Sequence, residues 1–249
     1  MVRPKNGDPV VDRALALLAA FSTEHRALGL MELSRRTGMP PSSTSRLAAR
    51  LYAWGALERD AAGRYVIGLR LFEIASLAPR SHGLRDVALP YLEDLHEVTR
   101  QHVLLAVRDG AEALLVERLS TRDAVEIDYR VGGRMPLCDT GVGLVLLAFA
   151  DEEVREERLA ALDAEAARTL RRQLADVRRR GLVAFTRHRP AAVSSIAVAV
   201  RDHTEQVIAA VSIIVPAATP RPQSYEPAVR ATARAISRAL GFTPPRARP

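Results

Sequence analysis

A short run of hydroxyl residues and arginines has the residue types with which proteins read DNA. The run follows Pro40-Pro41 and supplies Ser42, Ser43, Thr44, Arg46 and Arg50. In a helix, Ser42, Ser43, Arg46 and Arg50 project opposite Leu47 and Leu51. Small hydroxyls near the helix start allow close approach to the major groove, and Arg46 can reach a guanine edge or a phosphate. Each residue alone is also an ordinary surface residue, so the prediction depends on the surrounding elements.

Three helices are expected to position this surface. The first is predicted to begin at Asp8-Pro9, a capping side chain followed by proline at the first helical position. Its apolar stripe is predicted to consist of Val11, Leu15, Leu18 and Phe21. A second helix fits Leu30–Thr37, which buries Leu30 and Leu33 and stops at Gly38. A third fits residues 40–54, with Leu47, Leu51 and Trp54 on its inner face. Two short helices joined by a Gly-containing turn are typical of a helix-turn-helix.

A basic hairpin is predicted after the third helix. Two short strands, Leu57–Arg59 and Arg64–Ile67, flank the turn-rich residues 60–63. Arg64 in this hairpin, and Arg35 and Arg36 at the end of the second helix, are suited to phosphate contacts that set register. The order helix, turn, helix, hairpin predicts a winged helix-turn-helix over residues 1–68, followed by a linker helix over residues 69–82.

The distribution of charge supports this division. The chain has 249 residues and a net charge of +7, and residues 1–80 hold 12 basic and 7 acidic side chains, a net +5. A small basic module on a nearly neutral body indicates a nucleic-acid partner. The single cysteine excludes a disulfide framework. No apolar run approaches the ~18 residues of a membrane helix, and the N-terminus is not expected to be a secretory signal. We therefore expect a cytoplasmic protein with no membrane partner.

Residues 83–249 are predicted to form an α+β domain around an antiparallel sheet. A helix fits Leu84–Arg100, with an inner face that includes Val98, and a closing helix fits Ala228–Leu240. Three further helices are predicted at residues 141–150, 151–162 and 168–180. Strands are predicted at His102–Val107, Ala113–Leu119, Val125–Arg130, Leu182–Phe185, Ser195–Val200 and Val207–Val215.

One loop in this domain could hold an anion. Gly132 and Gly133 permit unusual backbone angles, and Thr140-Gly141 opens a helix. Helix starts leave backbone N–H groups free, which suits a carboxylate or a phosphate. The alternative is plain capping, in which Asp139 or Thr140 serves its own helix without a ligand.

The order of these residues resembles the IclR family of bacterial transcription regulators. The first matching stretches are VVDRALALLAAF, LGLMELSRRTGMPPSSTSRLAARLYAWGALERD and GRYVIGLRL, within residues 9–70. The loop YRVGGRMPLCDTGVG and the later pieces Ala197–Arg201 and Ala209–Pro216 match the family's ligand-sensing half, which is GAF-like. The resemblance covers residues 9 to about 242. It implies a homodimer or a dimer of dimers on a palindromic DNA site.

The resemblance also implies an effector pocket between the loop and the strand ends. The residues carried over to it are Arg130, Met135, Leu137, Asp139, Thr140, Gly141, Phe185, Ser195, Ser212 and Ile214. Phe185 and Ile214 make this pocket more apolar than is usual for the family, and Arg187 or His188 adds positive charge where acidic residues are common. These differences predict a small organic acid with an apolar or aromatic body.

Other functions receive less support. Cys138 could suggest nucleophilic catalysis, but no nucleophile elbow, paired catalytic carboxylates or HExxH motif accompanies it. We therefore expect that the protein is not an enzyme and that it binds no cofactor and no metal. A thiol-responsive regulator using Cys138 stays open, because thiolates at helix N-termini can have lowered pKa values. The main prediction is a ligand-responsive, sequence-specific DNA-binding transcription regulator.

Overall fold

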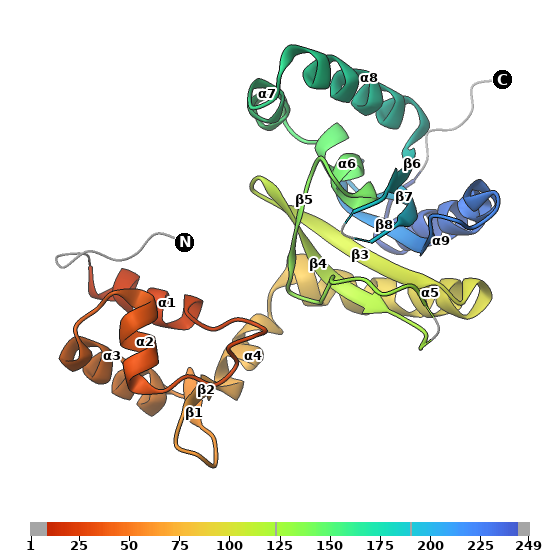
Figure 1. Cartoon of the computed structure of the whole chain (residues 1–249). Helices are drawn as coiled ribbons and strands as arrows, with labels where there is room; N and C mark the ends of the chain where they lie inside the picture. Colours follow the sequence, from red (N-terminus) through yellow and green to blue (C-terminus); the bar gives the residue numbers. More distant parts are fainter. Residues whose placement is uncertain (1–8, 123, 190, 244–249) are drawn as a thin grey trace. The chain divides into compact units, whose positions relative to one another are not determined.

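The computed structural model describes residues 9–122, 124–189 and 191–243, and the chain divides into two compact units, Met1–Ala78 and Pro79–Pro249. The first unit holds helices and a small hairpin, and the second is built on a large sheet (Figure 1). The boundary between them falls inside the segment expected to be the linker. Within the described residues, no helix combines the length and apolar character needed to span a membrane.

The first unit has the elements of a winged helix-turn-helix. They are α1 (Val10–Ala19), α2 (Leu30–Thr37), α3 (Pro41–Trp54), β1 (Leu57–Arg59), β2 (Tyr65–Ile67) and α4 (Leu69–Ala75). Gly38 ends α2 in the left-handed conformation at φ 74°, which glycine adopts without strain. The Ser34 hydroxyl donates to the Met39 carbonyl at 2.6 Å and fixes the turn into α3. The structure thus confirms the expected turn and hairpin.

Three expectations for these helices are wrong: the residue at which α1 begins, and the inward-facing residues of α1 and of α3. Pro9 is the N-cap of α1 and not its first helical residue, and Asp8 lies outside the described residues. Val11 and Leu15 are exposed, and Leu17 fills the core instead. Trp54 lies in the last turn of α3 and is 44% exposed, with the Arg70 guanidinium 4.7 Å from the centre of its ring. Exposed apolar side chains therefore remain on this unit.

The second unit is a six-stranded antiparallel sheet in the order β5-β4-β3-β8-β7-β6. Its strands are β3 (His102–Asp109), β4 (Glu112–Leu119), β5 (Arg134–Pro136), β6 (Leu182–Arg187), β7 (Val193–Arg201) and β8 (Val207–Pro216). Its main helices are α5 (Leu84–Thr99), α6 (Gly141–Ala148), α7 (Glu152–Ala160), α8 (Ala164–Arg180) and α9 (Glu226–Ala239). A π-helical turn, Pro79–Gly83, leads into α5, and a 3-10 turn, Pro222–Tyr225, leads into α9. The expected α+β class is confirmed.

Alternate residues of each strand face two separate cores. Leu104 belongs to the core shared with α6, α7 and α8, whereas Leu105 belongs to the core shared with α5 and α9. Figure 1 shows these helices on the two faces of the sheet. Val98, which was expected to face inward on α5, is 78% exposed because it lies on the outer side of that helix.

The segment 125–130 is not a strand, contrary to expectation. Its carbonyl groups bond to side chains and not to a neighbouring strand: Arg118 donates to the carbonyls of Ile127 and Tyr129, and the His102 ring contacts that of Val125. The other ring nitrogen of His102 lies 2.8 Å from the Ser120 hydroxyl. Burial lowers the pKa of His102, which favours its neutral form. These two side chains hold the segment beside the sheet.

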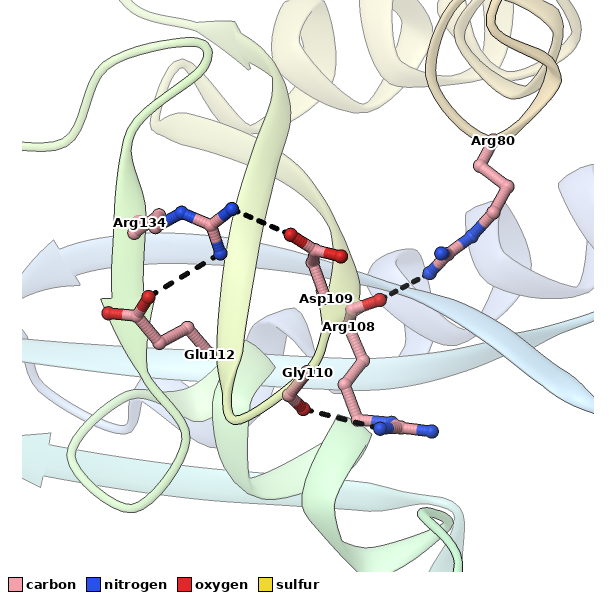
Figure 2. A network of polar contacts seen from close by, with 6 residues as sticks. All are labelled: Arg80, Arg108, Asp109, Gly110, Glu112 and Arg134. Carbon is pink, nitrogen blue, oxygen red and sulfur yellow. Dashed lines mark hydrogen bonds and ion pairs between the residues drawn. The ribbon is translucent and has the colours of Figure 1, made fainter. Parts of the chain in front are cut away.

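A polar network ties β5 to the tip of the β3–β4 hairpin. Arg134 forms ion pairs with Asp109 at 2.6 Å and with Glu112 at 3.4 Å, and Arg80 donates to the carbonyl of Arg108 (Figure 2). Arg134 and both of its acidic partners are about half exposed, so each pair contributes roughly 0–1 kcal/mol. The network holds the first residue of β5 against the tip of the hairpin.

Candidate functional site

The exposed surface of α3 brings together most of the residues expected to contact DNA. We call Ser42, Ser43, Arg46 and Arg50 the α3 surface. Ser42, Arg46 and Arg50 are exposed and Ser43 is half-buried. Arg46 and Arg50 are four residues apart, so they lie on one side of the helix. Within the described part of the chain neither guanidinium forms an ion pair. This arrangement presents two unneutralised cations and small hydroxyls on the same face.

Thr44 is wrong as a DNA contact. It is fully buried, and its hydroxyl donates to the carbonyl of Pro40 at 3.0 Å. The side chain thus holds the first turn of α3 onto the preceding turn. Helical spacing indicates this burial, because Thr44 precedes Leu47 by three residues and Leu51 by seven and so lies on their inner face.

The three other arginines that are expected to contact DNA differ in the groups that already bind their side chains. Arg35 is 77% exposed and lies 3.9 Å from Glu32. Arg36 donates from Nε to the carbonyl of Ala20 at 2.9 Å, so it joins α2 to the end of α1. Arg64 pairs with Asp60 at 2.7 Å, and this guanidinium holds the pKa of the Asp60 carboxyl below its usual range. A DNA phosphate that approaches Arg64 must compete with the Asp60 carboxylate. A phosphate at Arg35 competes only with the more distant Glu32.

A small cavity lies between the sheet and the start of α6. We call it the sheet cavity. It is lined by Leu104, Tyr129, Met135, Asp139, Thr140, Gly141, Val142, Phe185, Arg187, Val193, Ser195, Ser212 and Ile214. Its volume is about 10 Å³. That is about the space of one water molecule. A larger ligand therefore requires its side chains to move.

Most of the effector residues expected from sequence meet at this cavity, but two do not. Arg130 is exposed and Leu137 is buried, and neither lines the cavity. Leu137 lies against the start of α6, where a Cβ on Gly143 would be 2.7 Å from the Leu137 Cα. Arg130 is part of the turn that reaches Gly133. Of the residues between them, Met135 lines the cavity, and the loop meets it again over residues 139–142.

The start of α6 packs closely on the sheet. The Thr140 hydroxyl accepts from the backbone N–H of Gly143 at 3.1 Å and donates to the carbonyl of Pro136 at 2.9 Å. Thr140 is therefore an N-cap as well as a cavity residue. Gly141 lies against Ser195, and a Cβ at this position would overlap the Ser195 hydroxyl. The cap and the glycine place the helix start, with its free N–H groups, at the cavity wall.

Two polar atoms in the cavity are buried without a hydrogen-bond partner in the described structure: Arg187 Nε and Ser212 Oγ. The Arg187 guanidinium lies over the Tyr129 ring, 5.1 Å from its centre. Burial raises the pKa of the Tyr129 hydroxyl, and Arg187 opposes this effect. Arg187 and Tyr129 were not in the expected effector set; the added charge near position 187 was the sequence signal for Arg187. Most of the other residues that line the cavity are apolar. Arg187 Nε and Ser212 Oγ are therefore the polar atoms that a ligand could satisfy.

The surroundings of Cys138 disfavour its thiolate form. Burial raises the pKa of its thiol, the Asp139 carboxylate raises it further, and Arg158 acts in the opposite direction. The expected lowering of this pKa at a helix N-terminus is therefore wrong. Cys138 is absent from the residues lining the sheet cavity and packs against the apolar core under α6.

Comparisons with known proteins cover both units. Residues 10–61 match the family model described as the IclR helix-turn-helix domain, and residues 77–238 match the bacterial transcriptional regulator IclR C-terminal model. The HTH-type transcriptional repressor AllR of Escherichia coli strain K12 is 28% identical over 259 residues, 96% of each protein. The E. coli regulator XynR is 28% identical over 248 residues, 93% of this chain and 97% of XynR.

Solved structures show the same architecture. An IclR homolog from Microbacterium hydrocarbonoxydans, crystallised with 4-hydroxybenzoate, is 33% identical with a TM-score of 0.88, and the match covers 94% of this chain and 100% of that one. HmgR of Pseudomonas aeruginosa is 30% identical with a TM-score of 0.75, over 94% of this chain and 97% of HmgR.

Proposed function

Because the chain belongs to the IclR family of bacterial transcriptional regulators, we propose that an organic acid with an apolar body, bound in the sheet cavity, controls its binding to operator DNA. The family's regulators carry an effector-binding C-terminal domain, and this chain has that domain. The acid and its place in the cavity are our inference. We also propose a cytoplasmic location, because the proposed partner is chromosomal DNA.

The observation that carries the proposal is the pair of unsatisfied groups, Arg187 Nε and Ser212 Oγ. A buried donor without a partner costs ~1–3 kcal/mol. A carboxylate accepts from a guanidinium and from a hydroxyl at once, so it would relieve both costs. A neutral polyol offers Arg187 no negative charge, whereas the acid adds a carboxylate to the one that Asp139 already places in the cavity lining.

The rest of the cavity fits the body of such an acid. Leu104, Phe185 and Ile214 offer apolar surface, and aromatic pairing with Phe185 favours a flat ring. The complex of a 33% identical relative with 4-hydroxybenzoate supports an aromatic acid. We infer that binding draws Arg187 away from Tyr129 and opens the cavity, since the closed volume admits no ring.

Calorimetric titration of the full-length protein tests the acid requirement. We expect 4-hydroxybenzoate to bind at least about tenfold more tightly than 4-hydroxybenzyl alcohol, which lacks the charge, because hydrogen bonds to charged groups contribute ~1.5–3 kcal/mol. Glycerol, a neutral polyol, should not bind. Tight binding of the polyol, with none of either aromatic compound, would contradict the proposal.

For the DNA-binding unit, we propose that α3 enters the major groove. The α3 surface offers Arg46 for a base edge and the serines for close approach. Arg50 and Arg35 are placed for phosphates. An effector can regulate this contact only if it favours one arrangement of the DNA-binding units over another, and α4 is the segment through which we expect it to act.

We further propose that two copies pair through exposed apolar side chains of the first unit and bind a palindromic operator. Leu69 is 69% exposed, Ile74 49% and Leu77 80%. Apolar residues gathered on one short segment mark an interaction surface. A dimer of dimers requires a second interface, which we expect between the C-terminal domains.

A charge on this surface should weaken the pairing. We expect Leu77→Glu to lower the sedimentation coefficient at micromolar concentration, since association would bury the new carboxylate. Val98→Glu is the matched control, because Val98 is 78% exposed on α5 and lies outside the surface. If both variants sediment like the parent protein, Leu77 is not at the dimer interface.

A further inference from the structure

A second, larger cavity lies beside α9 and shares no lining residue with the sheet cavity. We call it the α9 groove, and its volume is about 480 Å³. It is lined by Gly181, Val198, Ala199, Arg201, Arg230, Ala233, Arg234, Ser237, Arg238 and Phe242. The volume lies within the ~300–1,000 Å³ of small-molecule sites. Unlike the sheet cavity, it can receive a ring-sized ligand without rearrangement.

The topology of the sheet explains why the groove is open. β6 begins at Leu182, which pairs with Val198, so the end of β7 continues past it without that neighbour. The Arg201 backbone N–H donates instead to the Ser237 hydroxyl of α9 at 3.0 Å. The groove occupies the place where a longer β6 would have covered the strand. Its floor is apolar, from Val198, Ala233 and Phe242.

The rim of the groove carries an excess of positive charge. Arg230, Arg234 and Arg238 are four residues apart and follow one side of α9. Like charges at this spacing destabilise a helix by a few tenths of a kcal/mol. Glu226 offsets only the first, since it bonds to Arg230 at 2.9 Å and to Arg180 at 3.5 Å. Arg238 lies in the last turn of α9, where the helix dipole favours a cation, so the repulsion is least offset at Arg234.

Four arginines line the α9 groove, and Arg230 is the one with an acidic partner in the described structure. Among the residues that the structure describes, Arg201, Arg234 and Arg238 form no ion pair. Arg201 lies over the Phe149 ring at 4.9 Å and donates to the carbonyl of Glu205 at 2.6 Å. No interaction of the Arg234 or Arg238 side chain restrains it in the described structure. Both can turn toward an anion above the apolar floor.

We propose that the α9 groove binds a second small molecule, an organic phosphate with an aromatic or other apolar body. Its body would lie on Val198, Ala233 and Phe242, and its phosphate would meet Arg234 and Arg238. A dianionic phosphate matches two guanidinium groups better than a monocarboxylate does, because each arginine can donate two hydrogen bonds. The site is independent of the proposed effector site and lies on a different part of the sheet.

Calorimetric titration of the full-length protein with phenyl phosphate tests this site. We expect one site per chain and affinity at least about tenfold lower in the Arg234→Gln/Arg238→Gln variant, since charged hydrogen bonds are lost. Arg168→Gln/Arg172→Gln removes the same charge at the same spacing from the exposed side of α8 and should bind like the parent. Arg187→Gln should also leave this binding unchanged, which separates it from the sheet cavity.

Three results would overturn the proposal. The first is no binding of phenyl phosphate at millimolar concentration. The second is equal weakening by both double variants, which would mean nonspecific attraction to charge. The third is a loss of operator affinity, without any effect on phenyl phosphate binding, in the Arg234→Gln/Arg238→Gln variant; the row would then be a DNA contact. Inorganic phosphate, added as a competitor, should bind more weakly because it lacks the apolar body.

Discussion

Replacing Arg187 with glutamine is expected to weaken 4-hydroxybenzoate binding by at least about tenfold and to leave operator affinity without ligand unchanged. Glutamine keeps a hydrogen-bond donor of similar reach but removes the charge that a carboxylate requires. Arg187 lines the sheet cavity and contributes one of its two unsatisfied groups. Calorimetry gives the first quantity, and fluorescence anisotropy with labelled operator gives the second.

Arg189 provides the matched control for this substitution. It is an exposed arginine two residues further along and does not line the cavity. Arg189→Gln should bind the acid like the parent protein. If the two substitutions weaken binding equally, general electrostatic attraction explains the affinity. If neither does, the acid does not contact Arg187.

Replacing Arg46 with alanine is expected to cost ~1–3 kcal/mol of operator affinity at one base pair of each half-site. Arg46 is exposed one turn into α3 and forms no ion pair among the described residues. Anisotropy should be measured on the operator and on single-base variants. The loss should be largest for the parent sequence, so that the variant discriminates less at that position.

Arg26→Ala is the control for the DNA experiment, because Arg26 is an exposed arginine of the same unit outside the α3 surface. It should change affinity little. Uniform weakening by Arg46→Ala across all sequences would make Arg46 a phosphate contact. Unchanged affinity would mean that Arg46 does not contact the DNA.

The sequence predicts best those elements whose ends are set by local chemistry. Gly38 fixes the end of α2, and Pro41 lies in the first turn of α3, so both helices are found within about one residue. α1 fails for the opposite reason. It is apolar on two sides, with Leu17 inward and Leu15 outward, and helical spacing alone cannot choose between them. The outer side is expected to be covered only in an assembly.

The residues of the sheet cavity are predicted by the family resemblance and not by strand alternation. Met135 lies on β5, a strand that the local pattern does not predict, and Ser195 lies on β7, where consecutive residues are buried on both faces. The segment 125–130 has strand-forming residues, but Arg118 and His102 occupy its carbonyl groups. No local pattern indicates such bonds. The contact of Arg187 with Tyr129 likewise forms because the fold brings β6 close to this segment, which is distant from it in the sequence.

The central claim is that an acid in the sheet cavity controls operator binding. The most direct test is the anisotropy of labelled operator, selected from random DNA with the full-length protein, during titration with 4-hydroxybenzoate. The parent protein should change operator affinity as the acid is added, and Arg187→Gln should reach the same final state at a ligand concentration at least about tenfold higher. Identical midpoints for the two proteins, or no change in the parent up to millimolar acid, would contradict the claim.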